Sequence, residues 1–129
     1  MSASSPDLKV CILRLGGIYG IGRELTKIFS RAFGTTRPGN GEDFTNWIHL
    51  DDIVGAVDFA SDKKLQGIYN LVSDRPLVSL EMLDRLSEKY DLPKVMWNSQ
   101  EGISPYNAQV SNQKILAAGY KFIHPDIML

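Results

Sequence analysis

The sequence predicts a protein of the α/β class, with two main parallel strands, additional short strands and about four flanking helices. Two nearly continuous apolar runs, 10–15 and 67–72, are typical of strands buried on both faces of a parallel sheet. Amphipathic segments lie between the runs, and parallel strands require such crossover connections. The 129 residues, 43% of them hydrophobic, are enough for one core, so we expect a single domain over residues 1–129.

The first predicted strand ends at a glycine pair and is followed by a segment with helical periodicity. Apolar residues recur at helical spacing from Arg23 to Phe33, and Gly34 marks the end of the predicted helix. Residues 34–45 hold three glycines and one proline with little apolar content. We therefore expect a long loop here, of a kind that is commonly functional.

A short apolar segment, 46–50, precedes a second predicted helix. Asp51 and Asp52 follow it and are good N-cap residues, so capping is a simpler role for them than paired-acid catalysis. The residues expected on the buried face of this helix are Ile53, Val57 and Ala60.

The second long strand, 67–72, is followed by two further predicted helices. Ser79 is expected to cap a helix that runs to about Tyr90, and Pro93 lies beyond its end. The last helix is expected over 111–118 and is followed by a glycine. The side chains expected to face inward from the first of the two are Leu80, Leu83 and Leu86.

The predicted sheet is narrow for an α/β core of this length. Strands buried on both faces normally belong to a wider sheet, and an open strand edge invites pairing with another chain. We therefore expect a partner, which is either a second copy of the chain or a missing N-terminal half.

Charge and composition exclude several classes of function. Fourteen Lys and Arg against 15 Asp and Glu give a net charge of −1, which provides no field for nucleic acid. A single cysteine, Cys11, forms no internal disulfide. No run approaches the roughly 20 apolar residues needed to cross a bilayer, and the first residues do not read as a secretion signal. We expect a cytoplasmic protein that binds neither nucleic acid nor membrane.

A glycine motif follows the first strand. Gly16, Gly20 and Gly22 have the spacing and the strand-to-helix context of a dinucleotide fingerprint. A mononucleotide-binding half would place a second strand about 20 residues on, where this sequence has the glycine-rich loop. A small stand-alone nucleotide-binding protein that uses this loop is therefore the alternative rather than the main interpretation.

Three motifs in order resemble those of extended and atypical short-chain dehydrogenases/reductases of the NAD-dependent epimerase/dehydratase, or nucleoside-diphosphate-sugar epimerase, type. VCILRLGGIYGIGR (10–23) is similar to the sixth strand and the Tyr-Gly-Pro-Gly-Arg loop of that family, with Ile21 in place of proline. NWIHLDDIVGAV (46–57) is similar to its Arg-Asp-Phe-Ile-His-Val-Asp-Asp block, and 67–72 to the next strand. The resemblance implies a partial Rossmann-like fragment, the C-terminal, substrate-side portion of the fold.

The resemblance also implies binding residues. In a complete fold, which would bind NAD or NADP, the segment Gly17, Ile18 and Tyr19 would line the nicotinamide side. We expect the chain alone to bind no cofactor tightly.

Four residues are candidates for substrate binding. Arg23, at a helix start, and Arg37, in the glycine-rich loop, are suited to an anion. Asn46 replaces the arginine that usually starts the second motif, which removes a charge-assisted fork for a nucleoside diphosphate and argues against a sugar nucleotide. The expected ligand is a sugar nucleotide or, given this replacement, a related small molecule. His49 is the fourth candidate, although a histidine beside a helix cap is more often structural. His124 is expected to be neutral to function, and no metal site is predicted.

No catalytic residue is predicted. The family's redox step uses a Tyr-x3-Lys pair on one helix. Tyr90 and Lys94 have that spacing, but Pro93 breaks the helix between them. We therefore expect a substrate-binding fragment without activity of its own; a non-catalytic, self-associating interaction module is a further alternative.

Overall fold

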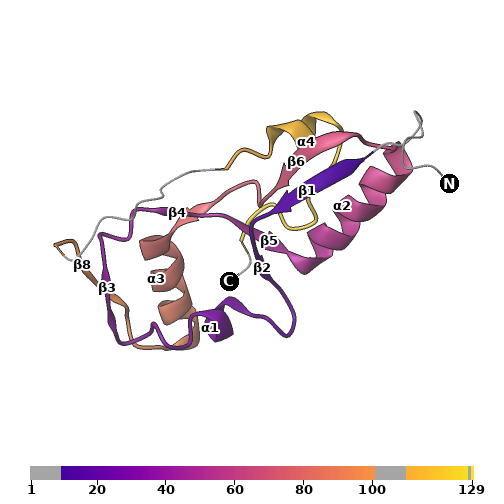
Figure 1. Ribbon diagram of the computed structural model, residues 1–129. Helices are drawn as coiled ribbons and strands as arrows, with labels where there is room; N and C mark the ends of the chain where they lie inside the picture. The colour runs from indigo at the N-terminus through magenta and orange to yellow at the C-terminus, as the bar shows by residue number, and fades with distance from the viewer. Residues whose placement is uncertain (1–9, 101–109, 128) are drawn as a thin grey trace.

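A computed structural model describes residues 10–100, 110–127 and 129, and it confirms the α/β class (Figure 1). The elements in chain order are β1 (Cys11–Leu15), β2 (Gly17–Tyr19), α1 (Leu25–Ile28), β3 (Thr36–Pro38), β4 (Phe44–Thr45), β5 (Trp47–His49), α2 (Leu50–Lys63), β6 (Gly67–Leu71), β7 (Leu77–Val78), α3 (Ser79–Tyr90), β8 (Met96–Asn98) and α4 (Gln113–Ala117). None of the helices in these ranges is long and apolar enough to cross a membrane.

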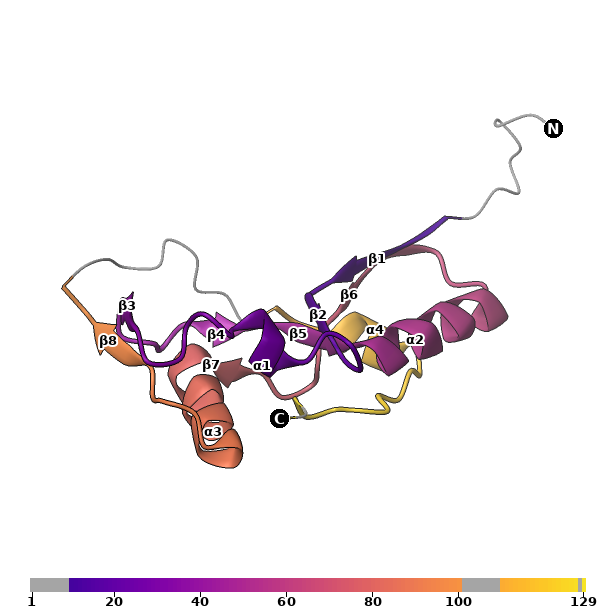
Figure 2. The same cartoon turned by 90° about the horizontal axis from the view of Figure 1, so that it is seen from below.

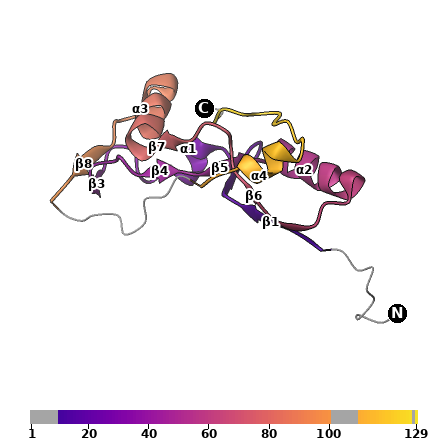
Figure 3. The ribbon, with the colours of Figure 1, turned by 90° about the horizontal axis from the view of Figure 1, so that it is seen from above.

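The elements form two lobes that lie end to end (Figure 2). One lobe holds the parallel pair β1–β6 with α2 and α4, and the other holds the parallel pair β3–β8 and the antiparallel pair β4–β7 with α3. The parallel pair β2–β5 lies between them. The last described residue, Leu129, returns to the junction of the lobes (Figure 3). Each lobe has its own apolar core.

The two long strands pair in parallel as predicted, with Cys11 opposite Gly67. Their burial differs from the prediction, because the strand pair has only one covered face. Leu71 and Tyr69 pack with residues of α2 and α4, whereas Ile12 and Ile68, opposite each other in the register, remain 49% and 41% exposed. Within the described residues, the outer face of this pair is open.

The helix predicted over 23–33 is wrong in length, since α1 covers only Leu25–Ile28. Glu24 occupies its N-cap without a side-chain hydrogen bond, and so short a helix has little intrinsic stability. After Ile28 the chain forms turns. Phe29, Ala32 and Phe33 in these turns pack into the apolar core of the lobe that holds α3.

The long loop predicted over the glycine-rich segment 34–45 is wrong in part, because this segment contains β3 and β4. β3 pairs with β8, and β4 pairs with β7. These two strands form because they pair with strands distant in the sequence, and local composition does not predict such pairing.

The start of α2 also differs from the prediction. Its N-cap is His49, whose Nδ1 accepts a hydrogen bond from the backbone N–H of Asp51 at 3.0 Å, and both aspartates lie in the first helical turn. The buried residues of the helix are Asp52, Ala56 and Ala60, of which the sequence predicts only Ala60. Val57, expected inside, is 53% exposed.

The last two helices lie close to their predicted positions. α3 ends at Tyr90 as expected, and Leu83 and Leu86 are buried, whereas Leu80 is half-buried. Its N-cap is Val78 rather than Ser79, whose hydroxyl donates to the Asp43 carboxylate at 2.8 Å. The predicted helix over 111–118 is shorter, since α4 covers Gln113–Ala117.

A buried carboxylate ties the C-terminal segment to α2. The side chain of Asp52 is fully buried and accepts hydrogen bonds from the Tyr120 hydroxyl at 2.6 Å, the Ile123 N–H at 2.7 Å and the His124 N–H at 2.9 Å. Burial, and then the hydrogen bond to Asp52, raise the pKa of the Tyr120 phenol. The N-terminus of α2 adds a favourable field for this charge.

We predict that Asp52→Asn lowers the free energy of unfolding by about 3 kcal/mol, because an amide offers one acceptor oxygen to three donors and turns its own N–H groups toward them. Urea denaturation followed by circular dichroism measures the change. The control is Asp58→Asn on the exposed side of the same helix, which should change stability by less than about 0.5 kcal/mol. Equal effects of the two substitutions would contradict the assigned role of Asp52.

Candidate functional site

A cavity of about 270 Å³ lies where the end of β2, α1, α3 and the C-terminus meet. Its wall is largely apolar, with a few polar groups, as in many small-molecule sites. The lining residues are Tyr19, Gly20, Ile21, Glu24, Leu25, Thr26, His49, Leu86, Tyr90 and Leu129.

The pair β2–β5 positions the two aromatic residues of the wall that the sequence singled out. Tyr19 and His49 are the last residues of these parallel strands and lie opposite each other in the register. Their rings meet edge to face, with centroids 5.1 Å apart. Both side chains therefore stand at the carboxyl edge of the strand pair, where ligands of parallel sheets usually bind.

Close approach of the two strands explains the glycine pair that precedes Tyr19. A Cβ on Gly16 would lie 2.5 Å from the carbonyl oxygen of Asn46, and a Cβ on Gly17 would lie 2.5 Å from the Trp47 ring. These glycines are therefore required by packing against β5, and they need no bound phosphate to account for them.

The rest of the glycine motif forms a tight turn. Gly20 and Arg23 exchange backbone hydrogen bonds of 2.9 and 3.1 Å, and the Arg23 Nε donates to the carbonyl of Ile18 at 3.0 Å. The Gly22 N–H donates to the Glu24 carboxylate at 3.1 Å. A carboxylate already occupies the position at which a dinucleotide loop would present an amide to phosphate.

The other predicted contacts lie apart from the cavity wall. The Arg37 guanidinium lies 5.9 Å from the ring centroids of both Phe29 and Trp97. The Asn46 side chain accepts a hydrogen bond from the Val110 N–H at 3.1 Å. Of the predicted binding residues, the structure thus brings Tyr19 and His49 together at the cavity and gives Arg23, Arg37 and Asn46 contacts elsewhere.

Tyr90 and Lys94, which have the Tyr-x3-Lys spacing, do not share a helix. α3 ends at Tyr90, and Asp91 has a left-handed conformation with φ of 52°. Lys94 instead lies 3.8 Å from the Glu88 carboxylate.

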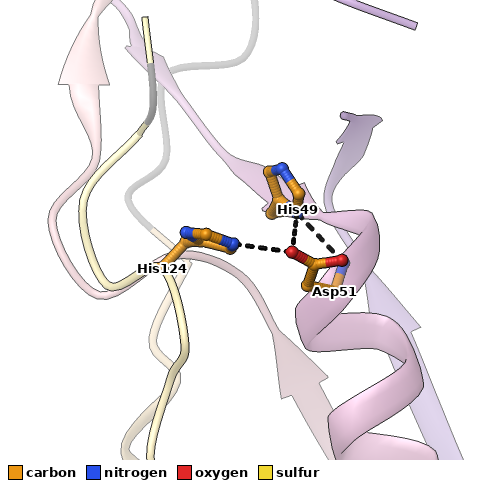
Figure 4. Close-up of side chains that lie close together, drawn as sticks. All are labelled: His49, Asp51 and His124. Carbon is orange, nitrogen blue, oxygen red and sulfur yellow. Dashed lines mark hydrogen bonds and ion pairs between the residues drawn. The ribbon is translucent and has the colours of Figure 1, made fainter. Parts of the chain in front are cut away.

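A second group of polar side chains joins His49 to the C-terminal segment (Figure 4). The His124 Nε2 lies 2.8 Å from the Asp51 carboxylate, the His49 Nδ1 lies 3.6 Å from it, and the two imidazole centroids are 4.1 Å apart. Two imidazoles and a carboxylate are also ligand types that divalent transition metals accept. The sequence predicts that His124 is neutral to function, because 75 positions separate it from His49 and only tertiary structure shows that they meet.

Burial, and then repulsion from His124, lower the pKa of His49. The hydrogen bond with His124 lowers the pKa of Asp51. Asp51 and Asp52 partly offset the effect on His49. The lowered pKa favours the neutral imidazole, and in that form the Nδ1 that accepts the Asp51 N–H leaves Nε2 as the protonated nitrogen.

We predict that the chain loses stability as the pH falls from 7.5 to 5.5. A histidine whose folded pKa lies below 6.5 is protonated more readily when unfolded, so acid favours unfolding in this window. His49→Asn retains a good N-cap residue and removes the titrating ring. Thermal unfolding in chelator-treated buffers should therefore show a flatter pH dependence for this variant; parallel curves for the two proteins would refute the prediction.

Comparisons with known proteins place this geometry in context. No family model matches the chain. Over 67 residues, which are 51% of this chain and 23% of the relative, the chain is 39% identical to the curated protein YeeZ of Escherichia coli strain K12.

Solved structures match over nearly the whole chain. A conserved protein of unknown function from Silicibacter pomeroyi matches with a TM-score of 0.75, 24% identity and coverage of 95% of this chain and 47% of its own. A candidate NAD-dependent epimerase/dehydratase from Methylobacillus flagellatus matches with a TM-score of 0.63 and 26% identity. The match covers 90% of this chain and 42% of that protein. The human epimerase family protein SDR39U1, solved with NADPH, matches with a TM-score of 0.71 and 18% identity. The match covers 95% of this chain and 46% of that protein.

The chain therefore spans less than half the length of these solved proteins. The expected resemblance is confirmed: the chain has a Rossmann-like α/β fold similar to part of the fold of NAD-dependent epimerase/dehydratase proteins.

Proposed function

We propose that residues 1–129 form the substrate-side, C-terminal portion of an NAD-dependent epimerase/dehydratase-like protein, and that this portion has no turnover of its own. The observation that carries the proposal is the placement of Tyr19 and His49, at the ends of two parallel strands, on the wall of one cavity. The carboxyl edge of parallel strands is the usual ligand-binding edge of open α/β sheets. The similar solved proteins are about twice as long as this chain.

The proposed roles follow from position and from the family resemblance. Gly17, Ile18 and Tyr19 face the nicotinamide of NAD or NADP once the complete fold is assembled, and His49 contacts the substrate from the cavity wall. The human neighbour was solved with NADPH, which supports a cofactor of this class for the complete fold.

Two arginines and an asparagine complete the proposed substrate set. Arg23, Arg37 and Asn46 extend it toward a sugar nucleotide or a related anionic molecule. The Arg23 Nε is anchored to the Ile18 carbonyl, which holds the guanidinium near β2, and Arg37 lies against aromatic rings that restrict it. We place the protein in the cytoplasm, on its single cysteine.

We predict that the isolated chain shows no saturable binding of NADH or NADPH, because the residues that hold the cofactor belong to the missing half. Nicotinamide fluorescence and thermal shift measure this, with UDP-glucose as a third ligand. A thermal shift with UDP-glucose that His49→Asn reduces would support the substrate-side assignment. Saturable cofactor binding that Gly22→Ala abolishes would overturn it and restore the small nucleotide-binding protein.

A second candidate function, association through an open sheet face, is favoured by one observation. Ile12 and Ile68 form an exposed apolar pair on the uncovered face of β1–β6, and Val10, directly before β1, is 56% exposed. Exposed apolar patches of this kind mark interaction sites, and an open edge strand adds unpaired backbone groups. We propose that a missing N-terminal half, or a second copy of the chain, covers this face.

We predict that the chain self-associates in solution and that the double variant Ile12→Lys/Ile68→Lys is monomeric, because two charges replace the apolar pair. Size-exclusion chromatography with light scattering gives the mass over a range of concentrations. Met96→Lys is the matched control, since Met96 is 61% exposed in the other lobe. A wild-type chain that is already monomeric at high concentration would contradict self-association and leave the missing half as the partner.

A further inference from the structure

We propose that His49, Asp51 and His124 form a binding site for a divalent transition-metal ion of the Zn²⁺ type. The structure brings one ligand atom of each residue within 4.8 Å of the other two. Two imidazole nitrogens and one carboxylate oxygen are a common protein ligand set for Zn²⁺, with water or a ligand in the remaining position. The site shares His49 with the cavity wall, whereas Asp51 and His124 have no proposed cofactor or substrate role.

The distances fit such an ion with little adjustment. Zn²⁺ binds nitrogen and oxygen at about 2.0–2.2 Å, which places neighbouring ligand atoms of a tetrahedron about 3.3–3.6 Å apart. The Asp51 carboxylate lies 3.6 Å from the His49 Nδ1 and 2.8 Å from the His124 Nε2. The 2.8 Å contact has to lengthen by about 0.5 Å to reach this range. The two imidazole nitrogens, which lie within 4.8 Å of each other, also have to meet it, so binding requires the His124 ring to shift.

The surroundings hold the two histidines in place before any ion binds. The His124 backbone is held by the buried Asp52 carboxylate at 2.9 Å, and the His49 ring packs edge to face on Tyr19. Such outer contacts orient ligand side chains and strengthen metal sites. Asp51 is exposed, so one side of the site faces solvent and leaves a coordination position for water.

Two features oppose the ion, and the arrangement offsets the first of them. The N-terminus of α2 carries a partial positive charge, which the carboxylates of Asp51 and Asp52 counter. The Nδ1 of His49 accepts the Asp51 N–H, so an ion has to displace this hydrogen bond. The carboxylate of Asp51 then has to become a metal ligand in place of its contact with His124.

The test uses the full chain without a tag, because its two histidines are the only ones in the sequence. Isothermal titration with ZnCl₂ measures affinity and stoichiometry, and the visible absorption of added Co²⁺ reports the coordination number. We expect one ion per chain, a tetrahedral Co²⁺ spectrum and at least a tenfold loss of affinity in Asp51→Asn and in His124→Gln. Asp58→Asn, on an exposed position of the same helix, is the matched control and should bind like the wild type.

The variants separate a metal site from a purely structural cluster. Asp51 is exposed, so Asp51→Asn should keep the fold, which circular dichroism checks. Absence of saturable Zn²⁺ binding by the wild type would overturn the proposal. Binding that persists unchanged in both folded variants would overturn it as well, because the ion would then lie elsewhere.

Discussion

The buried carboxylate of Asp52 is the constraint on which much of the structure depends. A fully buried charge is costly unless hydrogen bonds satisfy it, and here a phenol and two backbone amides of the C-terminal segment do so. To satisfy Asp52, residues 120–124 have to return across the first turn of α2. That return brings His124 to Asp51 and leads the chain end back toward the cavity between the lobes.

Close contact between β2 and β5 is the second constraint. Side chains on Gly16 or Gly17 would collide with β5, so only glycine lets the strands approach. This approach places Tyr19 against His49 and builds the cavity wall. One histidine thus serves three features of the molecule: it caps α2, lines the cavity and joins the cluster with Asp51 and His124.

The uncovered face of β1–β6 connects the fold to the proposed function. A parallel pair with helices on one side is half of a layered α/β core, and the apolar residues on its other side have the character of an interior. This agrees with a chain that spans less than half of the solved proteins it resembles. Because the residues on the uncovered face are also apolar, the sequence predicts strands that are buried on both faces.

Local patterns in the sequence determined the class of fold, the two long strands, the existence of α2 and α3 and the end of α3, because apolar periodicity and stop signals act within a few residues. Tertiary structure alone decided the features that depend on distant partners. β3 and β4, within 34–45, pair with the distant strands β8 and β7. The helix that begins at Leu25 ends early, and Phe29 and Phe33 beyond it pack against the core. The meeting of His49 with His124 depends on Asp52, whose partners lie about 70 residues away, beyond the reach of any local pattern.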